Sequence, residues 1–187
     1  MQNIMIYIWV VCAFIIVWAM IGYPLFLKII DKLIKAPSIK KDYAYMPTVT
    51  ILVVAHNEEK VIKEKLENLI NINYPSELFS IIVTSDFSTD KTNEIVEDFI
   101  SEHKNLDIKL HKTIKHGGKT NAQNEALKLI DSELVIMTDA NCFFDTNAVK
   151  EIVACFHDKN IKYVCGATVY VNSNENRTAD SETTYWD

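Results

Sequence analysis

The feature that most constrains this chain is the position of its first charged residue, Lys28. Residues 1–27 are largely apolar, and a helix of about 20 such residues can cross a bilayer. Trp9, Trp18 and Tyr23 suit the interfaces of a membrane span. A secretory signal peptide is the alternative, but the stretch has no basic n-region and no small-residue cleavage site. We therefore predict a transmembrane helix over residues 1–30, a linker over 31–47 and one domain over 48–187.

The charges that flank this segment predict its orientation. Five lysines follow the apolar stretch and no basic residue precedes it, which favours a single pass through the cell membrane with the domain in the cytoplasm; they are Lys28, Lys32, Lys35, Lys40 and Lys41. The four cysteines form no CxxC pair, which fits a reducing compartment and argues against a zinc site of cysteines. The net charge of −6 argues against a nucleic-acid partner.

After residue 47 the sequence alternates between two patterns. Short apolar runs rich in β-branched residues predict buried strands, and stretches with apolar residues at helical spacing predict helices that cover them. The predicted strands are 48–55, 80–85, 107–111, 134–138 and 163–171, and the predicted helices are 58–70, 90–100, 120–130 and 146–156. This order predicts an α/β fold with a doubly wound, mainly parallel sheet. In such sheets ligands bind beyond the carboxyl ends of the strands.

Three predicted strands end in polar loops that carry acids. The loop after the first strand contains His56 and Glu58, the next contains Asp86 and the fourth-strand loop contains Asp139. Acids gathered at one edge of a sheet repel each other unless they bind a cation or donor groups. Each loop also has a purely structural interpretation, because Asn57 or Asp90 could cap a helix and Asp86 could form an Asx turn.

The chain has only four glycines, and two of them are adjacent in Gly117-Gly118-Lys119-Thr120. The segment is not a P-loop, since that motif needs glycine at position 113, which is Thr113. A glycine pair that leads into a helix beside a lysine still suits an anionic phosphate. A solvated loop is the alternative.

These segments, taken in order, resemble family 2 glycosyltransferases of the GT-A fold. The ordered series is VTILVVAHNEE, SDFSTDKT, GGKTNAQNEAL, TDAN, YVCGATVYV and ETTYW. The chain is most similar to the membrane-anchored poly-N-acetylglucosamine, hyaluronan and cellulose synthases. The resemblance implies a Rossmann-like GT-A domain over 48–187 and a hexosyltransferase. Such an enzyme moves a sugar from a nucleotide-diphosphate donor, usually a UDP-sugar, to a glycan or lipid acceptor.

The resemblance also implies site residues. It sets His56 near the uracil ring, Asp86 at the uracil edge and Gly118 and Lys119 near the diphosphate. Asp139 matches the first acid of the DxD motif, which holds Mg²⁺ or Mn²⁺. The full set of expected donor-binding residues is His56, Glu58, Asp86, Gly118, Lys119 and Asp139, with Asp139 and Asn141 as metal ligands.

The sequence also departs from the family pattern. Asn141 replaces the second DxD acid and brings an oxygen ligand without a charge. Phe87 occupies a position that is commonly glycine, and we expect it to alter only the packing of its loop. The family's general base and QxxRW motif are expected beyond Asp187, so we assign no catalytic residue. We also expect an incomplete sheet. A separately encoded C-terminal half is a possible partner. The alternatives are an inactive membrane-tethered fragment that binds a nucleotide or protein partner, and, less favoured, a receiver-like signalling domain.

Overall fold

The computed structural model describes residues 2–34 and 39–167, and these form two compact units that divide near residue 39. Over residues 2–33 the first unit is helical, from α1 (Gln2–Val17) through a π-helical turn (Trp18–Gly22) to α2 (Tyr23–Leu33). One stretch, Asn3–Leu33, is long and apolar enough to cross a membrane, with a mean hydropathy of 2.7. This helix is therefore a candidate membrane span on its length and composition.

The π-helical turn has a local cause. Pro24 has no backbone N–H to donate, and the preceding turn widens so that the Tyr23 N–H donates to the Trp18 carbonyl oxygen instead. The aromatic ring of Trp18 lies over Gly22, where a β-carbon would come within 2.4 Å of a ring atom. Glycine at this position therefore lets the ring pack against the helix backbone.

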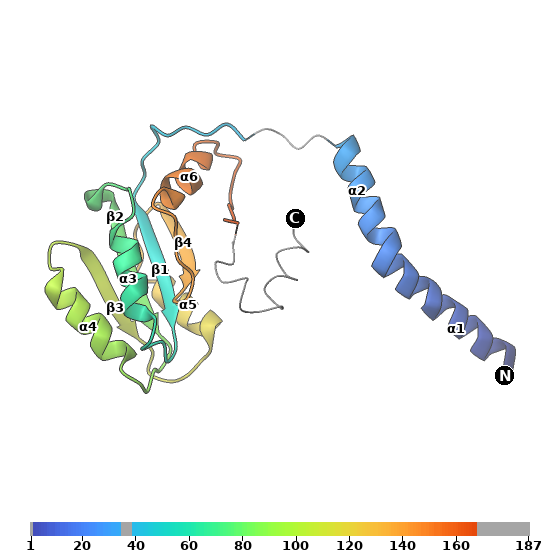
Figure 1. Ribbon diagram of the computed structural model, residues 1–187, viewed down its shortest axis with the longest axis horizontal. Helices are drawn as coiled ribbons and strands as arrows, with labels where there is room; N and C mark the ends of the chain where they lie inside the picture. Colours follow the sequence, from blue (N-terminus) through green and yellow to red (C-terminus); the bar gives the residue numbers. More distant parts are fainter. Residues whose placement is uncertain (1, 35–38, 168–187) are drawn as a thin grey trace, which may run out of the picture. The chain divides into compact units, whose positions relative to one another are not determined.

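The second unit is built on a parallel sheet with strand order β3-β2-β1-β4 (Figure 1). Its strands are β1 (Val49–Ala55), β2 (Phe79–Ser85), β3 (Asp107–Lys112) and β4 (Leu134–Asp139). The register aligns Ala55 with Ser85 and Val54 with Asp139, so the last residues of β1, β2 and β4 lie at one edge. The predicted parallel α/β architecture is thus confirmed, including the weakly patterned third strand.

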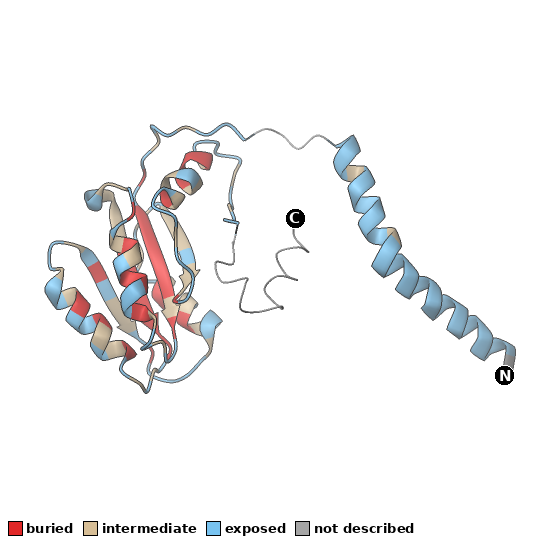
Figure 2. Cartoon of the chain, in the orientation of Figure 1, coloured by how far each residue is buried: buried red, intermediate tan, exposed pale blue. Residues whose placement is uncertain are grey.

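Helices cover both faces of this sheet. They are α3 (Ile62–Ile70), α4 (Thr92–Glu102), α5 (Lys119–Leu127) and α6 (Ala148–Cys155), with a short 3₁₀ turn at Ser76–Leu78. One face carries the larger core, in which Ile51 and Val53 of β1 pack with residues of α3, α4 and α6. On the other face Leu52 packs beneath α5, in a smaller cluster. The central strand β1 is almost wholly buried (Figure 2).

Two sequence expectations need correction. The strand predicted at 163–171 is not present over 163–167, where the chain has no regular structure and Tyr163 is 81% exposed; residues 168–171 lie outside the described residues. The apolar alternation there has no neighbouring strand to pair with among the described residues. The first predicted helix begins at Ile62, because residues 58–61 form a turn instead.

Residues 40–47, just before β1, belong to the second unit and are bonded to its other parts. The Asp42 N–H donates to the Ala154 carbonyl oxygen at 3.0 Å, and Lys41 pairs with Glu151 at 2.6 Å. Tyr45 donates to Glu133 at 2.5 Å, and this bond raises the pKa of the Tyr45 phenol to about 12. The segment that leads into β1 is therefore tied to α6 and to the start of β4.

Candidate functional site

An open cleft of about 250 Å³ lies at the carboxyl edge of the sheet. Its lining includes six of the seven residues expected from the sequence, namely His56, Glu58, Asp86, Lys119, Asp139 and Asn141. The seventh, Gly118, forms a hydrogen bond to Asp86 and precedes Lys119. The fold therefore brings all of the expected site residues together.

Asp86 is the most buried polar side chain of the cleft, with 2% of its surface exposed. Its two carboxylate oxygens accept hydrogen bonds from the backbone N–H groups of Gly117 at 3.0 Å and Gly118 at 2.9 Å. His116 Nδ1 lies 2.9 Å from the same carboxylate. Burial acts to raise the Asp86 pKa, but these hydrogen bonds and the nearby imidazole outweigh it and lower the pKa below its ordinary value. Asp86 is therefore a fixed carboxylate and not a residue of a simple Asx turn.

Gly118 explains why glycine is needed in this loop. Its backbone has φ +80°, a conformation that side-chain-bearing residues rarely adopt. This conformation turns the Gly118 N–H toward Asp86 just before α5 begins at Lys119. Gly117 is constrained by space, because a β-carbon there would lie 2.6 Å from the Asn121 side chain. The glycine pair thus joins the second strand-end loop to the start of α5.

The first two strand-end loops are also bonded to each other. The Asn57 side-chain oxygen accepts from the Thr89 N–H at 2.8 Å, and the Glu58 N–H donates to the Thr92 hydroxyl at 2.8 Å. Asn57 does not cap α3, whose N-cap residue is Val61 and has no side-chain cap. Asp90, in contrast, accepts from the Thr92 N–H at 3.0 Å at the start of α4. These bonds hold His56 and Asp86 on one rigid side of the cleft.

Phe87 follows Asp86 with a backbone φ of +55°. Left-handed conformations cost a bulky residue about 1–2 kcal/mol, and glycine adopts them freely. This explains why glycine is common at this position in the family that the sequence resembles. The substitution therefore affects backbone strain as well as loop packing, because the Phe87 side chain is itself half exposed.

Asp139 and Lys119 also line the cleft, and Asp139 ends β4, which lies on the other side of β1 from β2 and Asp86. Lys119 Nζ lies 2.5 Å from Asp139 Oδ1, and the two side chains are 55% and 45% exposed. Asn141 is exposed two residues further along, in the turn that follows β4. Carboxylate and amide oxygens at this turn are the ligand types that Mg²⁺ and Mn²⁺ prefer.

A buried lysine beneath this turn was not expected from the sequence. Lysine usually lies on the solvent-facing side of a helix, yet Lys65 is fully buried, and it donates to the Thr138 hydroxyl at 3.2 Å and to the Cys142 carbonyl oxygen. Its ammonium lies 4.4 Å from the centroid of the Phe144 ring. Burial lowers the Lys65 pKa to about 8. Lys65 lies on the same helical stripe as Ile62 and Leu69, and that spacing is the signal that could have found it.

His116 is a second residue that sequence reasoning missed. Its ring contacts that of His56, with centroids 4.6 Å apart and an interplanar angle of 38°. The His56 Nδ1 atom lies 2.6 Å from the Asp86 carbonyl oxygen, which can only accept, so this nitrogen carries the proton. Because His116 and His56 come from loops 60 residues apart in the sequence, only the fold could reveal their contact.

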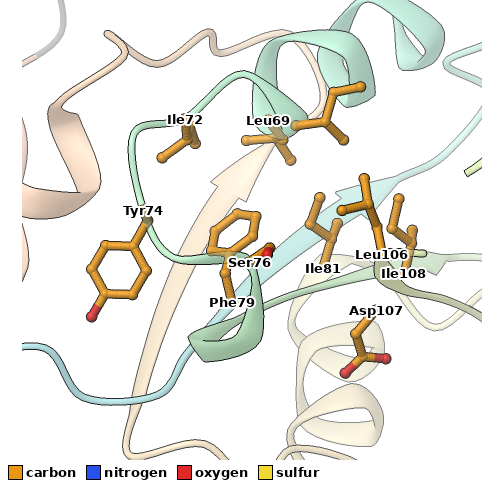
Figure 3. A pocket seen from close by; sticks show the side chains of 10 residues that line it. Leu69, Ile72, Tyr74, Ser76, Phe79, Ile81, Leu106, Asp107 and Ile108 are labelled. Atoms are coloured by element: carbon orange, nitrogen blue, oxygen red, sulfur yellow. The ribbon is translucent and has the colours of Figure 1, made fainter.

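A second pocket lies at the other end of the strands, where β2 and β3 begin (Figure 3). Its labelled side chains are mainly apolar and include Leu69, Ile72, Phe79, Leu106 and Ile108. Asp107 is the one acid that lines it. The chemistry-bearing groups therefore gather at the carboxyl edge, as expected for open parallel sheets.

A parallel sheet with acidic strand-end loops and a glycine turn at a helix start places the domain among α/β proteins whose ligands bind at the carboxyl edge of the sheet. Comparison with known families gives the particular assignment. The family model described as glycosyl transferase family 2 matches residues 50–186, so the chain belongs to that family.

Curated relatives agree with this assignment. Beta-monoglucosyldiacylglycerol synthase of Nostoc sp. is 31% identical over 131 residues, covering 70% of this chain and 28% of the relative. Poly-beta-1,6-N-acetyl-D-glucosamine synthase of Staphylococcus epidermidis is 31% identical over 110 residues, covering 59% of this chain and 26% of the relative. The chain thus spans less than a third of the length of these relatives.

Solved structures support the GT-A fold. A mannosyltransferase from Pyrobaculum calidifontis, in complex with GDP-Man and Mn²⁺, is 30% identical, with a TM-score of 0.72 over 78% of this chain and 43% of that chain. TarS from S. aureus, in complex with UDP-GlcNAc, is 27% identical, with a TM-score of 0.55 over 69% of this chain and 38% of that chain. The first of these relatives was solved with a nucleotide sugar and a divalent cation, and the second with a nucleotide sugar.

Proposed function

We propose that this chain binds the donor of a glycosyl-transfer reaction, a UDP-sugar, in the cleft at the carboxyl edge of its sheet. The protein would use it to transfer a sugar to a glycan or lipid acceptor. The observation that carries the proposal is that one cleft is lined by Asp86, which follows β2, and by the Lys119–Asp139 pair at the end of β4, with β1 between these two strands. A nucleoside diphosphate needs such a pair of sites, one for its base and one for its charged phosphates.

The base would bind on the Asp86 side. A carboxylate that is held ionised can accept a hydrogen bond from a ring N–H, and the base would take the place of the exposed His116 imidazole, which lies 2.9 Å from one Asp86 oxygen. The rings of His56 and His116 are too close together to hold a base between them. They would therefore offer an edge or an outer face to the base.

The diphosphate would bind on the Asp139 side. Asp139 and Asn141 would hold Mg²⁺ or Mn²⁺ through oxygen atoms, and a bound cation neutralises charge on the leaving diphosphate. Lys119 at the start of α5 would turn from Asp139 to the phosphates once the cation takes its place. Glu58 lines the cleft near the base side, and we assign it to donor binding without a more specific role.

The apolar helix Asn3–Leu33 supports attachment to the cell membrane. Lysines lie in its last turns and just beyond its C-terminal end, so we propose that the domain faces the cytoplasm, where nucleotide sugars are made. A glycan or lipid acceptor at the membrane fits this placement.

Isothermal titration of the full chain in detergent with UDP, GDP and ADP, each with Mn²⁺, tests the proposal. We expect UDP to bind most tightly and the Asp86→Ala variant to lose this binding. Asp98→Ala is the matched control, since Asp98 is an exposed acid on α4. No heat with UDP, tighter binding of GDP than of UDP, or equal binding by Asp86→Ala would contradict the assignment.

A further inference from the structure

The base side of the cleft carries a group of side chains that donor binding does not fully explain. His56, Asp86 and His116 each offer one metal-ligand atom, and these three atoms lie within 4.8 Å of one another. Tetrahedral Zn²⁺ sets its nitrogen and oxygen ligands about 3.3 Å apart. Both histidine side chains are exposed and can rotate by the small amount that this requires, whereas Asp86 is held in place by backbone amides.

The contacts of the two rings decide which nitrogen atoms can bind the ion. His56 Nδ1 donates to the Asp86 carbonyl oxygen at 2.6 Å, which leaves His56 Nε2 as its ligand atom. Histidines that bind metals usually hold one ring nitrogen by such a bond to a carbonyl or carboxylate. The Asn57 amide lies 3.4 Å from His56 Nε2 and fits that nitrogen being the acceptor. His116 Nδ1 lies 2.9 Å from the Asp86 carboxylate, close to the separation of two zinc ligands, so these two atoms can bind one ion together.

The ligand types separate this group from the other side of the cleft. Imidazole nitrogen favours Zn²⁺, Cu²⁺ and Ni²⁺, whereas the oxygens of Asp139 and Asn141 favour Mg²⁺ and Mn²⁺. We propose that His56, Asp86 and His116 form a second metal site, selective for Zn²⁺ over Mg²⁺ and Mn²⁺, and that Zn²⁺ bound there excludes the donor's base. The exclusion rests on the proposed function, because Asp86 would bind either the base or the metal. The metal site itself does not depend on the proposed function.

Isothermal titration of the full chain with Zn²⁺ alone tests the metal site, using protein purified without a polyhistidine tag. We expect one ion per chain and an affinity reduced about tenfold or more in His56→Ala and in His116→Ala. His157→Ala is a matched control, since His157 pairs with one carboxylate, Asp42, at 3.3 Å. Cys142→Ser controls for the exposed thiol near Asn141. Equal Zn²⁺ binding in both histidine variants, or loss of binding in Cys142→Ser alone, would overturn the site.

The exclusion needs a competitor that does not itself chelate zinc, and uridine meets this condition because it has no phosphates. Saturating uridine is expected to weaken Zn²⁺ binding, and Zn²⁺ to weaken uridine binding by the same factor. If uridine binds in the absence of zinc but leaves the Zn²⁺ affinity unchanged, the proposed exclusion is wrong. If uridine does not bind, the proposed donor site fails, while the Zn²⁺ titrations of the variants still decide the metal site.

Discussion

The two carboxylates of the cleft, Asp86 and Asp139, differ in how many of their hydrogen-bond and ion-pair partners the protein itself supplies. Asp86 is 2% exposed and accepts hydrogen bonds from Gly117 and Gly118, whereas Asp139 is 45% exposed and has Lys119 as its ion-pair partner. Asp86 is held in position by its hydrogen-bond donors before any ligand binds. Asp139 has one mobile partner, Lys119, and can exchange that partner for a cation. We infer that the base side is preformed and that the phosphate side is completed by what it binds.

The largest expected effect, on both stability and UDP binding, comes from removing the Asp86 carboxylate on the preformed base side. Asp86→Ala removes a buried carboxylate and leaves the Gly117 and Gly118 N–H groups without their acceptor, and we expect the free energy of unfolding to fall by about 2–4 kcal/mol together with the loss of UDP binding. Urea denaturation measures the first effect. Because the folded-state pKa of Asp86 is lowered, its stabilisation is present at neutral pH and is lost as the pH falls through that pKa. A destabilisation no larger than that of Asp98→Ala would show that the preformed side does not hold the loops together.

Substitution of Lys65 tests how the turn after β4, on the phosphate side of the cleft, is supported. Its pKa is lowered from 10.5 to about 8, so the unfolded chain binds more protons between these values and stability rises with pH across that window. The rise attributable to Lys65 is about 3 kcal/mol. Lys65→Met removes the titration and is expected to flatten the dependence, measured by urea denaturation at pH 8 and pH 10. The exposed Lys63→Met is the control, and equal pH dependence in Lys65→Met and wild type would contradict the burial of this ammonium.

Asp139→Asn changes the phosphate side of the cleft, which we infer is completed by its ligand. Because Asp139 is exposed, the free energy of unfolding is expected to change by less than about 0.5 kcal/mol. The affinity for UDP in the presence of Mn²⁺ should fall about tenfold, which is about 1.4 kcal/mol. Calorimetric titration with and without Mn²⁺ measures both the affinity and its dependence on the cation. A variant that binds UDP as tightly as wild type, with the same response to Mn²⁺, would exclude Asp139 as a ligand.

The smallest effect is expected at Phe87. Phe87→Gly relieves a backbone held at φ +55° but gives the unfolded chain more freedom, so we expect a gain in unfolding free energy of up to about 1 kcal/mol. Thermal unfolding checks this, and UDP affinity should change less than twofold. Destabilisation by more than 1 kcal/mol would mean that the Phe87 ring contributes packing that outweighs the strain.

The sequence predicted the residues whose positions follow from strand ends. His56, Asp86 and Asp139 each follow an apolar run, and the parallel register brings them to one edge. Lys65 was missed because its residue type suggested a solvent-facing position although its spacing was that of the apolar stripe. His116 was missed because its partners lie in loops distant in sequence. The strand at 163–171 was predicted from an apolar run rich in β-branched residues, and none is present over 163–167. Pairing with a neighbour, which composition does not supply, decides whether such a segment forms a strand.

The most direct test of a preformed base side and a completed phosphate side compares uridine with UDP. The full chain is titrated with each ligand in the absence and presence of Mn²⁺, and the four affinities are compared. We predict that uridine binds with the same affinity in both conditions, whereas UDP gains at least about tenfold, or 1.4 kcal/mol, from Mn²⁺. A uridine affinity that depends on Mn²⁺, or a UDP affinity that does not, would contradict the division of the cleft between Asp86 and Asp139.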